Sequence, residues 1–583
     1  MKMLIVSNRN TLRSRLSRKG FTLIELLAVI VILAIIALIA VPQVIKILNK
    51  ARMSAALDSS EGYIKAVENK IVLEEMKDEE NKITDGTYLV KNLNVDYKGK
   101  GPSSGVVVVE KMNIKNARLC INNYSIDYDG EKSSISGSNY CDTDSKLIIS
   151  VNGNEEEIAL TDSLTYNYTL TSDILNSSTN ISCNNSAVPS IDGNSLKIDN
   201  VYGNTLCSIN KTLKESIDNT DTSLTNIIMV NDESNFKNVD VKDEKNIILN
   251  LNGKKLTGLG ILIYVKNGSL ILNGDGVVYS SSTAYGYSPI KKWSYNNSHL
   301  VINGNMCNST DINSYQSGTL IYGNSEAFGI YYNSGSTGGE SSLEINGGCF
   351  VSSENSGVYI DERNNNKAVI NGGLFIGKYG LNNYQYSNLV ITGGKFIGTT
   401  TSGIYNYGNL TIEQNENSVY ITSNAQEWKP ALLNGAGEIN INGKQADNCT
   451  NNYNDTKEGL CIYAEGDKNY QKNTANGGIQ NLSGFISLNG GTIYGGHQGV
   501  NNGGEGIFNI NNSYINSSNG AVLNNATGSI NICNSKINSS RYDIYNMAGV
   551  INYSDSVMFT NGIDPVIIKN EGTINKNYSG LCK

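Results

Sequence analysis

Apolar and polar positions follow two different patterns along the chain, with the change near residue 80. Every residue from 26 to 41 is apolar, and apolar residues then recur at helical spacing as far as Met76. Together these stretches predict one helix from about Thr22 to Lys77, on the order of 80 Å long at 1.5 Å per residue. Beyond residue 83 apolar and polar residues alternate in short runs, which predicts β-strands.

A repeated unit dominates the chain after residue 226. "LEINGGCFVS" begins at 343, "AVINGGLFIG" at 368 and "LVITGGKFIG" at 389, and related phrases begin at 486, 508 and 530. A unit of about 22 residues is too short for a domain and lacks helical periodicity. It predicts one coil of a β-solenoid with three strands and three corners, in which Gly supplies positive φ and Asn forms hydrogen-bonded ladders. Residues 226–583 would hold about a dozen coils of about 4.8 Å each. The alternative, a β-propeller, needs blades of about forty residues.

Charge is distributed unevenly. The first twenty residues carry six Lys or Arg and no Asp or Glu, so the remainder has a net charge of −14 within a total of −8. Such an acidic body argues against binding to nucleic acid. The basic segment before the apolar run predicts a single span that starts in the cytoplasm. Glu25 stands near the start of that run, where an unpaired carboxylate costs roughly 2.5–3.5 kcal/mol or more.

The stretch "RKGFTLIELLAVIVILAIIALIAVPQ" resembles the prepilin signal of type IV pilins and secretion pseudopilins. The resemblance implies that a membrane peptidase cuts between Gly20 and Phe21 and methylates the new amino terminus. It also implies that Glu25 pairs with the amino-terminal ammonium of a neighbouring subunit. Pro42 lies where helices of this family bend or melt on assembly, in line with its missing backbone donor. A plain signal-anchor helix with an incidental Glu is the alternative.

The resulting domain prediction is mostly β with one long amino-terminal α-helix. Its parts are a leader at 1–20, the pilin helix at 21–82, a small pilin-like β head at 83–142, a β spacer at 143–225 and a right-handed parallel β-helix at 226–583.

"NIILNLNGKKLTG" and the recurring "INGGxF" phrases resemble the pectate-lyase-like superfamily, which includes polysaccharide lyases and hydrolases. These chemistries need grouped Asp residues, with an Arg or Lys base in the lyases. Arg occurs in this region only at Arg363 and Arg541, and His497 and Asp275 stand apart from any such group. Asp240, Asp243 and Glu244 are most simply a solvated loop. We therefore expect no catalytic residues, no metal and no cofactor.

The ten cysteines are scattered and include no CxxC pair. In an exported protein, local disulfides are expected between Cys120 and Cys141, Cys183 and Cys207, or Cys449 and Cys461; buried free thiols are the alternative. The 34 tyrosines, expected mainly at corners and loops, suit either a ligand surface or simple packing.

The sequence thus predicts a minor type IV pilin subunit that displays an adhesive β-helix. It would sit in the cytoplasmic membrane with its amino terminus inside, and later in an extracellular filament or on the cell surface. Its partners would be other pilin subunits, a prepilin peptidase and methylase, and a host or bacterial surface glycan or protein. A tethered polysaccharide lyase or hydrolase and a purely structural pseudopilin are the alternatives.

Overall fold

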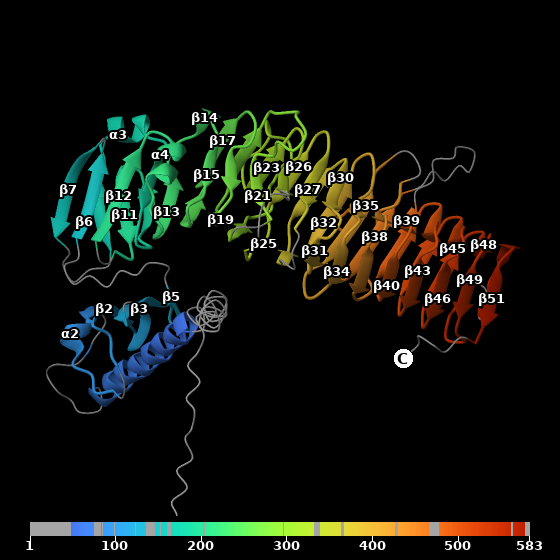
Figure 1. Ribbon diagram of the computed structural model, residues 1–583, viewed down its shortest axis with the longest axis horizontal. Helices are drawn as coiled ribbons and strands as arrows, with labels where there is room; N and C mark the ends of the chain where they lie inside the picture. The colour runs from blue at the N-terminus through green and yellow to red at the C-terminus, as the bar shows by residue number, and fades with distance from the viewer. Residues whose placement is uncertain are drawn as a thin grey trace, which may run out of the picture.

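The described chain consists of a helix, a small antiparallel sheet and a long solenoid (Figure 1). The computed structural model describes residues 48–577 apart from 75–82, 84–85, 98–99, 123, 136–145, 152, 160–164, 202–203, 295–296, 332–338, 363–366, 426–428, 457, 466–476, 561 and 563. Gly20, Phe21, Glu25, Pro42 and Cys141 lie outside the described residues. Within the described part, no helix is both long enough and apolar enough to cross a lipid bilayer.

The helix at 48–74 packs on a five-stranded antiparallel sheet in the order β1-β2-β3-β4-β5. Its buried face carries Tyr63, Ile64, Val67 and Ile71, whose spacing places them on one side of a helix. They share one core with apolar side chains of β2 and β3. The elements of this head are β1 (Gly86–Leu89), α2 (Val90–Leu93), β2 (Ser104–Glu110), β3 (Asn113–Ile121), β4 (Tyr124–Tyr128) and β5 (Ser133–Ile135).

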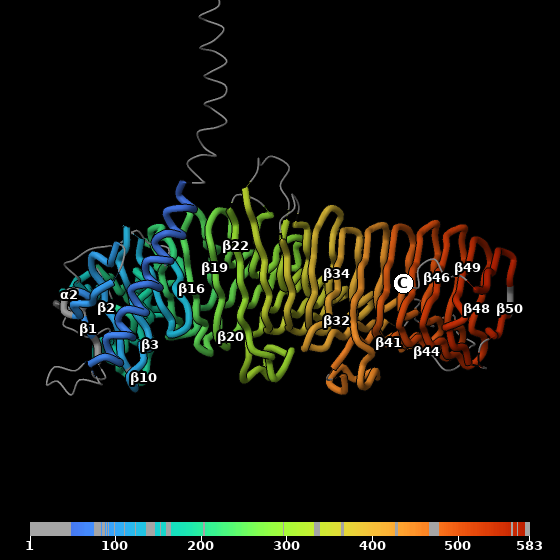
Figure 2. Tube along the Cα trace, turned by 90° about the horizontal axis from the view of Figure 1, so that it is seen from below, coloured from blue at the N-terminus to red at the C-terminus, as the bar shows by residue number. Residues whose placement is uncertain are grey.

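Three long sheets form the solenoid, and successive strands of the chain visit them in turn (Figure 2). Neighbouring strands are parallel throughout. Sheet 1 contains β13 (Leu224–Met229), β16 (Lys245–Asn250), β19 (Gly268–Asn273), β22 (Ser298–Asn303), β25 (Ser342–Ile345), β28 (Lys367–Ile370), β31 (Asn388–Ile391), β34 (Asn409–Glu413), β37 (Glu438–Asn442), β40 (Phe485–Asn489), β43 (Ile507–Asn511), β46 (Ser529–Cys533), β49 (Val550–Tyr553) and β51 (Thr573–Lys576).

Sheet 2 is 12-stranded, which corresponds to the dozen coils expected from the repeat. Its strands are β14 (Glu233–Phe236), β17 (Lys254–Gly258), β20 (Gly276–Ser280), β23 (Thr319–Gly323), β26 (Cys349–Ser352), β29 (Leu374–Gly377), β32 (Gly394–Gly398), β35 (Val419–Ser423), β38 (Leu460–Ala464), β41 (Thr492–Gly495), β44 (Tyr514–Ser517) and β47 (Lys536–Ser539).

Sheet 3 is 13-stranded. Its strands are β15 (Val239–Val241), β18 (Ile263–Val265), β21 (Ile290–Trp293), β24 (Phe328–Tyr331), β27 (Ser356–Ile360), β30 (Tyr379–Asn383), β33 (Ile404–Asn406), β36 (Leu432–Asn434), β39 (Gly477–Asn481), β42 (Gln498–Asn502), β45 (Gly520–Asn524), β48 (Tyr542–Asn546) and β50 (Ile567–Asn570).

The repeated phrases explain the coil. In "INGGxF" the Ile points inward at the end of a sheet 1 strand, and the second glycine takes positive φ at the corner, as at Gly373 (φ +116). The aromatic residue then points inward on sheet 2. Phe350, Phe375 and Phe396 stack on one another with centroids 4.9 and 4.8 Å apart, one ring per coil. Each repeat of the sequence therefore adds one layer of side chains to the core.

A buried asparagine ladder follows the corner between sheets 3 and 1, as the sequence predicts. The Asn383 amide donates to Asn406 Oδ1 at 2.7 Å, and the chain of bonds continues coil by coil as far as Asn570. Asn383 and Asn406 are fully buried. Each amide pairs with the next coil, so the ladder satisfies polar groups that the turn would otherwise leave buried without partners.

Residues 143–225, expected to form a spacer, are joined directly to the solenoid. Strand β9 lies antiparallel between β12 and β13, and β12 continues to β6 and β7. These strands cover the edge that the first coil would otherwise expose, which is the usual protection against edge-to-edge association. The elements of this cap are β6 (Lys146–Val151), β7 (Asn154–Ala159), β8 (Tyr166–Thr169), α3 (Ser172–Ser177), β9 (Asn180–Cys183), β10 (Val188–Asp192), β11 (Ser195–Asp199), β12 (Asn204–Asn210) and α4 (Leu213–Asp218).

One buried arginine connects the head to this cap, and Figure 1 shows the head beside that end of the solenoid. Arg118 on β3 pairs with Asp127 on β4, with Nη2 3.0 Å from Oδ2. Its Nη1 donates to the carbonyl oxygens of Asn185 and Asn200 at 3.1 and 3.0 Å. Because the donors of a guanidinium form a rigid fork, these bonds fix the orientation of the head relative to the cap.

Candidate binding surface

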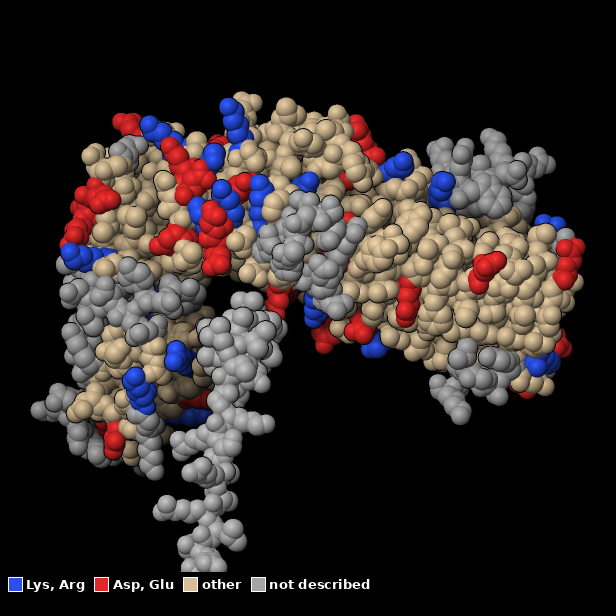
Figure 3. All heavy atoms as spheres, in the orientation of Figure 1, with Lys and Arg blue, Asp and Glu red and all other residues tan. Residues whose placement is uncertain are grey.

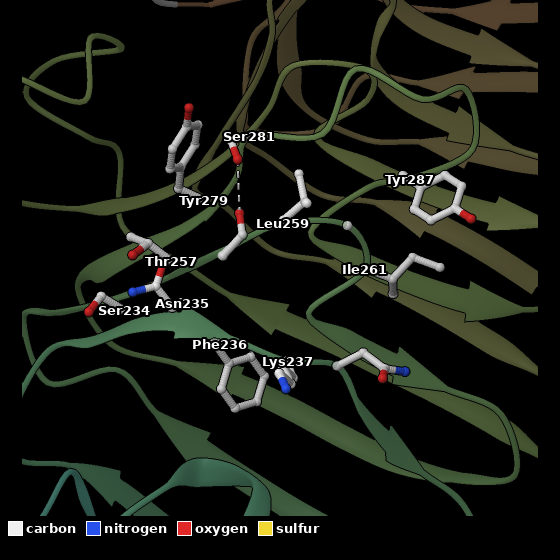
Figure 4. A pocket seen from close by; sticks show the side chains of 13 residues that line it. Ser234, Asn235, Phe236, Lys237, Thr257, Leu259, Ile261, Tyr279, Ser281 and Tyr287 are labelled. Carbon is white, nitrogen blue, oxygen red and sulfur yellow. Dashed lines mark hydrogen bonds between the residues drawn. The ribbon is translucent and has the colours of Figure 1, made fainter.

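A groove lies at the corner between sheets 2 and 3, near the capped end. It has a volume of about 720 Å³. Three successive turns form it, the β14–β15 turn, the β17–β18 turn and the loop that follows β20. Leu259 projects between Tyr279 and Tyr287 (Figure 4). Leu259 and Tyr287 are 73% and 46% exposed. The turn residues differ from coil to coil because no core contact constrains them, so each loop can carry its own side chains.

Polar groups line the opposite side of this groove. Ser234, Asn235, Asn238 and Thr257 contribute hydroxyl and amide groups, and Lys237 is the one charged lining residue. Asn235 has positive φ (55), a conformation that Asn tolerates better than most residues. A groove with aromatic walls and unengaged hydrogen-bonding groups is suited to a polyhydroxylated ligand.

A row of aromatic rings extends from this region along the outer face of sheet 3. Tyr331 and Tyr359 stack at 5.0 Å, and Tyr384 follows at 5.8 Å from Tyr359. Lys291 lies 4.1 Å from the centre of the Tyr331 ring. Tyr residues were expected mainly at corners and loops, but Tyr331 and Tyr359 occupy outward positions of strands β24 and β27. The period of the coil places them in line, which explains their stacking.

Glu326 lies beneath this row. Its side chain is fully buried, Asn355 Nδ2 donates to its Oε1 at 3.3 Å, and its Oε2 has no hydrogen-bond partner among the described residues. Burial raises the pKa of Glu326 to about 7, against the opposing effect of the Lys291 ammonium. Burial in turn lowers the pKa of Lys291. Glu326 is therefore an acid that titrates near neutral pH.

We expect Glu326 to make the native chain less stable as the pH rises. Its pKa is higher in the native state than in the unfolded state, so its stabilising effect is complete below about pH 4.5 and lost as the pH passes about 7. The shift corresponds to roughly 3 kcal/mol. Glu326→Gln should unfold at higher urea concentration than the native sequence at pH 8, and the advantage should vanish near pH 4.5. An equal advantage at both pH values would contradict this.

The candidate catalytic residues of the sequence do not lie together in the structure. The Nδ1 of His497 lies 3.0 Å from the Nδ2 of the Asn519 amide, and burial lowers the pKa of His497. Asp240 forms an ion pair with Lys266 at 2.7 Å, and Asp275 accepts a bond from the Asn305 amide. Among the described residues, no three His, Cys, Asp or Glu side chains are placed to hold a metal ion.

Disulfide bonds connect several segments of the chain. Cys183 and Cys207 join β9 to β12, and Cys449 and Cys461 close a loop before β38. Cys120 is disulfide-bonded, but Cys141 is outside the described residues. Sequence reasoning missed the bond between Cys307 and Cys349, which are separated by 42 positions.

Charged side chains gather over the first coils on the face shown in Figure 3 and become sparse toward the carboxyl end.

Comparison with known proteins bears on the amino terminus. Residues 15–41 match the family model of the prokaryotic N-terminal methylation motif. The amino terminus is type IV pilin-like. The motif implies processing by a prepilin peptidase and assembly with other pilins, from a membrane-anchored precursor to a surface filament. No curated protein and no solved structure matches the chain. The handedness of the solenoid and a relationship to pectate-lyase-like proteins stay predictions.

Proposed function

We propose that the protein is a minor subunit of a type IV filament and displays its solenoid as a binding domain. The observation that carries the proposal is the union, in one chain, of the methylation motif at 15–41 with a solenoid whose second sheet has 12 strands. A rod of that size would crowd a helically packed major subunit. Its ligand would be a glycan or protein on a host or bacterial surface.

The head supports this arrangement. The amphipathic helix at 48–74 follows the matched motif in the sequence, and β1–β5 cover one of its sides, as the shared core shows. Val72 and Leu73 are 54% and 55% exposed on its other side. That side would remain available to the helices of neighbouring subunits, while the Arg118 contacts keep the rod in a fixed direction.

Processing gives a direct test. In cells that contain the prepilin peptidase, mass spectrometry of the amino-terminal peptide should show a chain that begins with methylated Phe21. In cells that lack the peptidase, residues 1–20 should remain and the protein should not reach the surface. Trimming before Phe21, or surface display, without the peptidase would contradict the proposal.

A tethered polysaccharide lyase or hydrolase is the second candidate, favoured by the buried acid Glu326 beside Lys291, because burial raises the pKa of Glu326 and lowers that of Lys291. We propose that the chain is not an enzyme. Incubation of the purified chain with a panel of pectins and other glycans, with and without calcium, should release no shortened or unsaturated products. Product release that Glu326→Gln abolishes would favour the enzyme instead.

A further inference from the structure

The corner groove combines groups that folding does not use. Within the described residues, the side chains of Ser234, Asn235, Asn238 and Thr257 accept and donate no hydrogen bonds, although all four line the groove. By contrast, the Asn434 and Asn481 amides of the ladder each donate to the Asn of the next coil. Unused amides and hydroxyls on one concave surface can bind the hydroxyl groups of a sugar.

The apolar walls supply the second part of the argument. Tyr287 and Leu259 are large and exposed, and they lie on the side of the groove opposite Ser234 and Asn235 (Figure 4). The rings of Tyr279 and Tyr322 pack edge to face with their centroids 5.5 Å apart, so packing fixes the position of Tyr279. The ring of Tyr287 lies against Gly260, where an added Cβ would come within 3.5 Å of it. A sugar ring has an apolar face that packs on such side chains.

The charge of Lys237 indicates the class of sugar that would fit the groove. Lys237 lines the groove and forms no ion pair with any described residue. The carboxylates nearest to it in sequence have other partners. Asp232 accepts from the Lys255 amide at 2.9 Å, and Glu233 accepts from the Leu213 amide at 2.8 Å. Asp240 pairs with Lys266. The ammonium is thus free for an anionic group on the ligand.

From these three features we propose that the corner groove binds a saccharide that carries a carboxylate. Lys237 pairs with the carboxylate, Asn235, Asn238 and Thr257 hydrogen-bond to hydroxyl groups, and Tyr287 packs on the face of the sugar. This proposal rests on the proposed binding function and gives its ligand class and position.

Two probes that differ by one carboxylated sugar test the proposal, 3′-sialyllactose and lactose. Each is titrated into the purified mature chain in detergent solution, and binding is followed by ligand-observed NMR. Sialyllactose should bind about tenfold more tightly, as expected for one charge-assisted hydrogen bond. Equal affinities, or no binding of either sugar at millimolar concentration, would overturn the proposal.

Variants separate the two kinds of contact. Lys237→Gln should abolish the tenfold preference for sialyllactose over lactose, whereas Tyr287→Ala should weaken the binding of both sugars. Tyr494→Ala is the matched control, because Tyr494 stacks on Tyr463 on sheet 2, outside the groove. A preference that survives Lys237→Gln would refute the assigned role of Lys237. Filament labelling is independent of these titrations, so their failure would leave the filament role standing.

Discussion

Lys292→Met should lower the free energy of unfolding by roughly 3–5 kcal/mol, because it leaves the Glu362 carboxylate buried without its counter-charge. Lys292 and Glu362 are both fully buried, with Nζ 2.8 Å from Oε2. The ammonium also donates to the Trp293 carbonyl at 2.9 Å and to the Ser341 hydroxyl. The pair lies where later coils place the asparagine ladder.

The double variant Lys292→Met/Glu362→Leu is the control. Replacing both charges with apolar groups of similar size is often neutral or stabilising, so most of the lost stability should return. Urea unfolding followed by circular dichroism gives the stability. Hydrogen exchange of β21 and β25 shows whether the loss is local, as expected for a solenoid whose coils contact only their neighbours. A single variant as stable as the native sequence would contradict this prediction.

Glu25→Ala should reduce incorporation into filaments roughly tenfold or more. The Phe21 ammonium of one subunit would meet the Glu25 carboxylate of its neighbour inside an apolar bundle, where each charge alone is costly. Removing the carboxylate leaves that ammonium without compensation, and a loss of about 1.4 kcal/mol already corresponds to tenfold.

Incorporation is measured by immunoblotting of sheared filaments against the total protein. Glu25→Gln keeps the size of the side chain and should fail as Glu25→Ala does, whereas Glu61→Gln, at an exposed position of the helix at 48–74, should assemble normally. A Glu25→Ala chain that polymerises as readily as the native chain would contradict the pairing.

The solenoid coil could be predicted from the sequence because each repeat of the sequence corresponds to one layer of side chains in the core. Ile345, Gly373 and Phe375 each take the position that the repeated phrase assigns to them. The helix at 48–74 follows from apolar spacing in the same way. The cap could not be separated from a spacer, because pairing between β9, β12 and β13 depends on contacts distant in sequence.

The candidate site was beyond sequence reasoning for a similar reason. The groove draws on turns of three coils, and those turns do not repeat. Lys292 and Glu362 are 70 positions apart, and Cys307 and Cys349 are 42 apart, so only the register between coils brings each pair together. Lys292, at the inward position that follows Ile290 in β21, was the one available signal for the buried pair.

Immunogold labelling of sheared filaments with antibody raised against residues 226–577 tests the central claim most directly. We predict sparse labels on filaments of native cells and none on filaments from cells that lack the protein. Labels that remain with the cell membrane while the filaments stay bare would contradict the account.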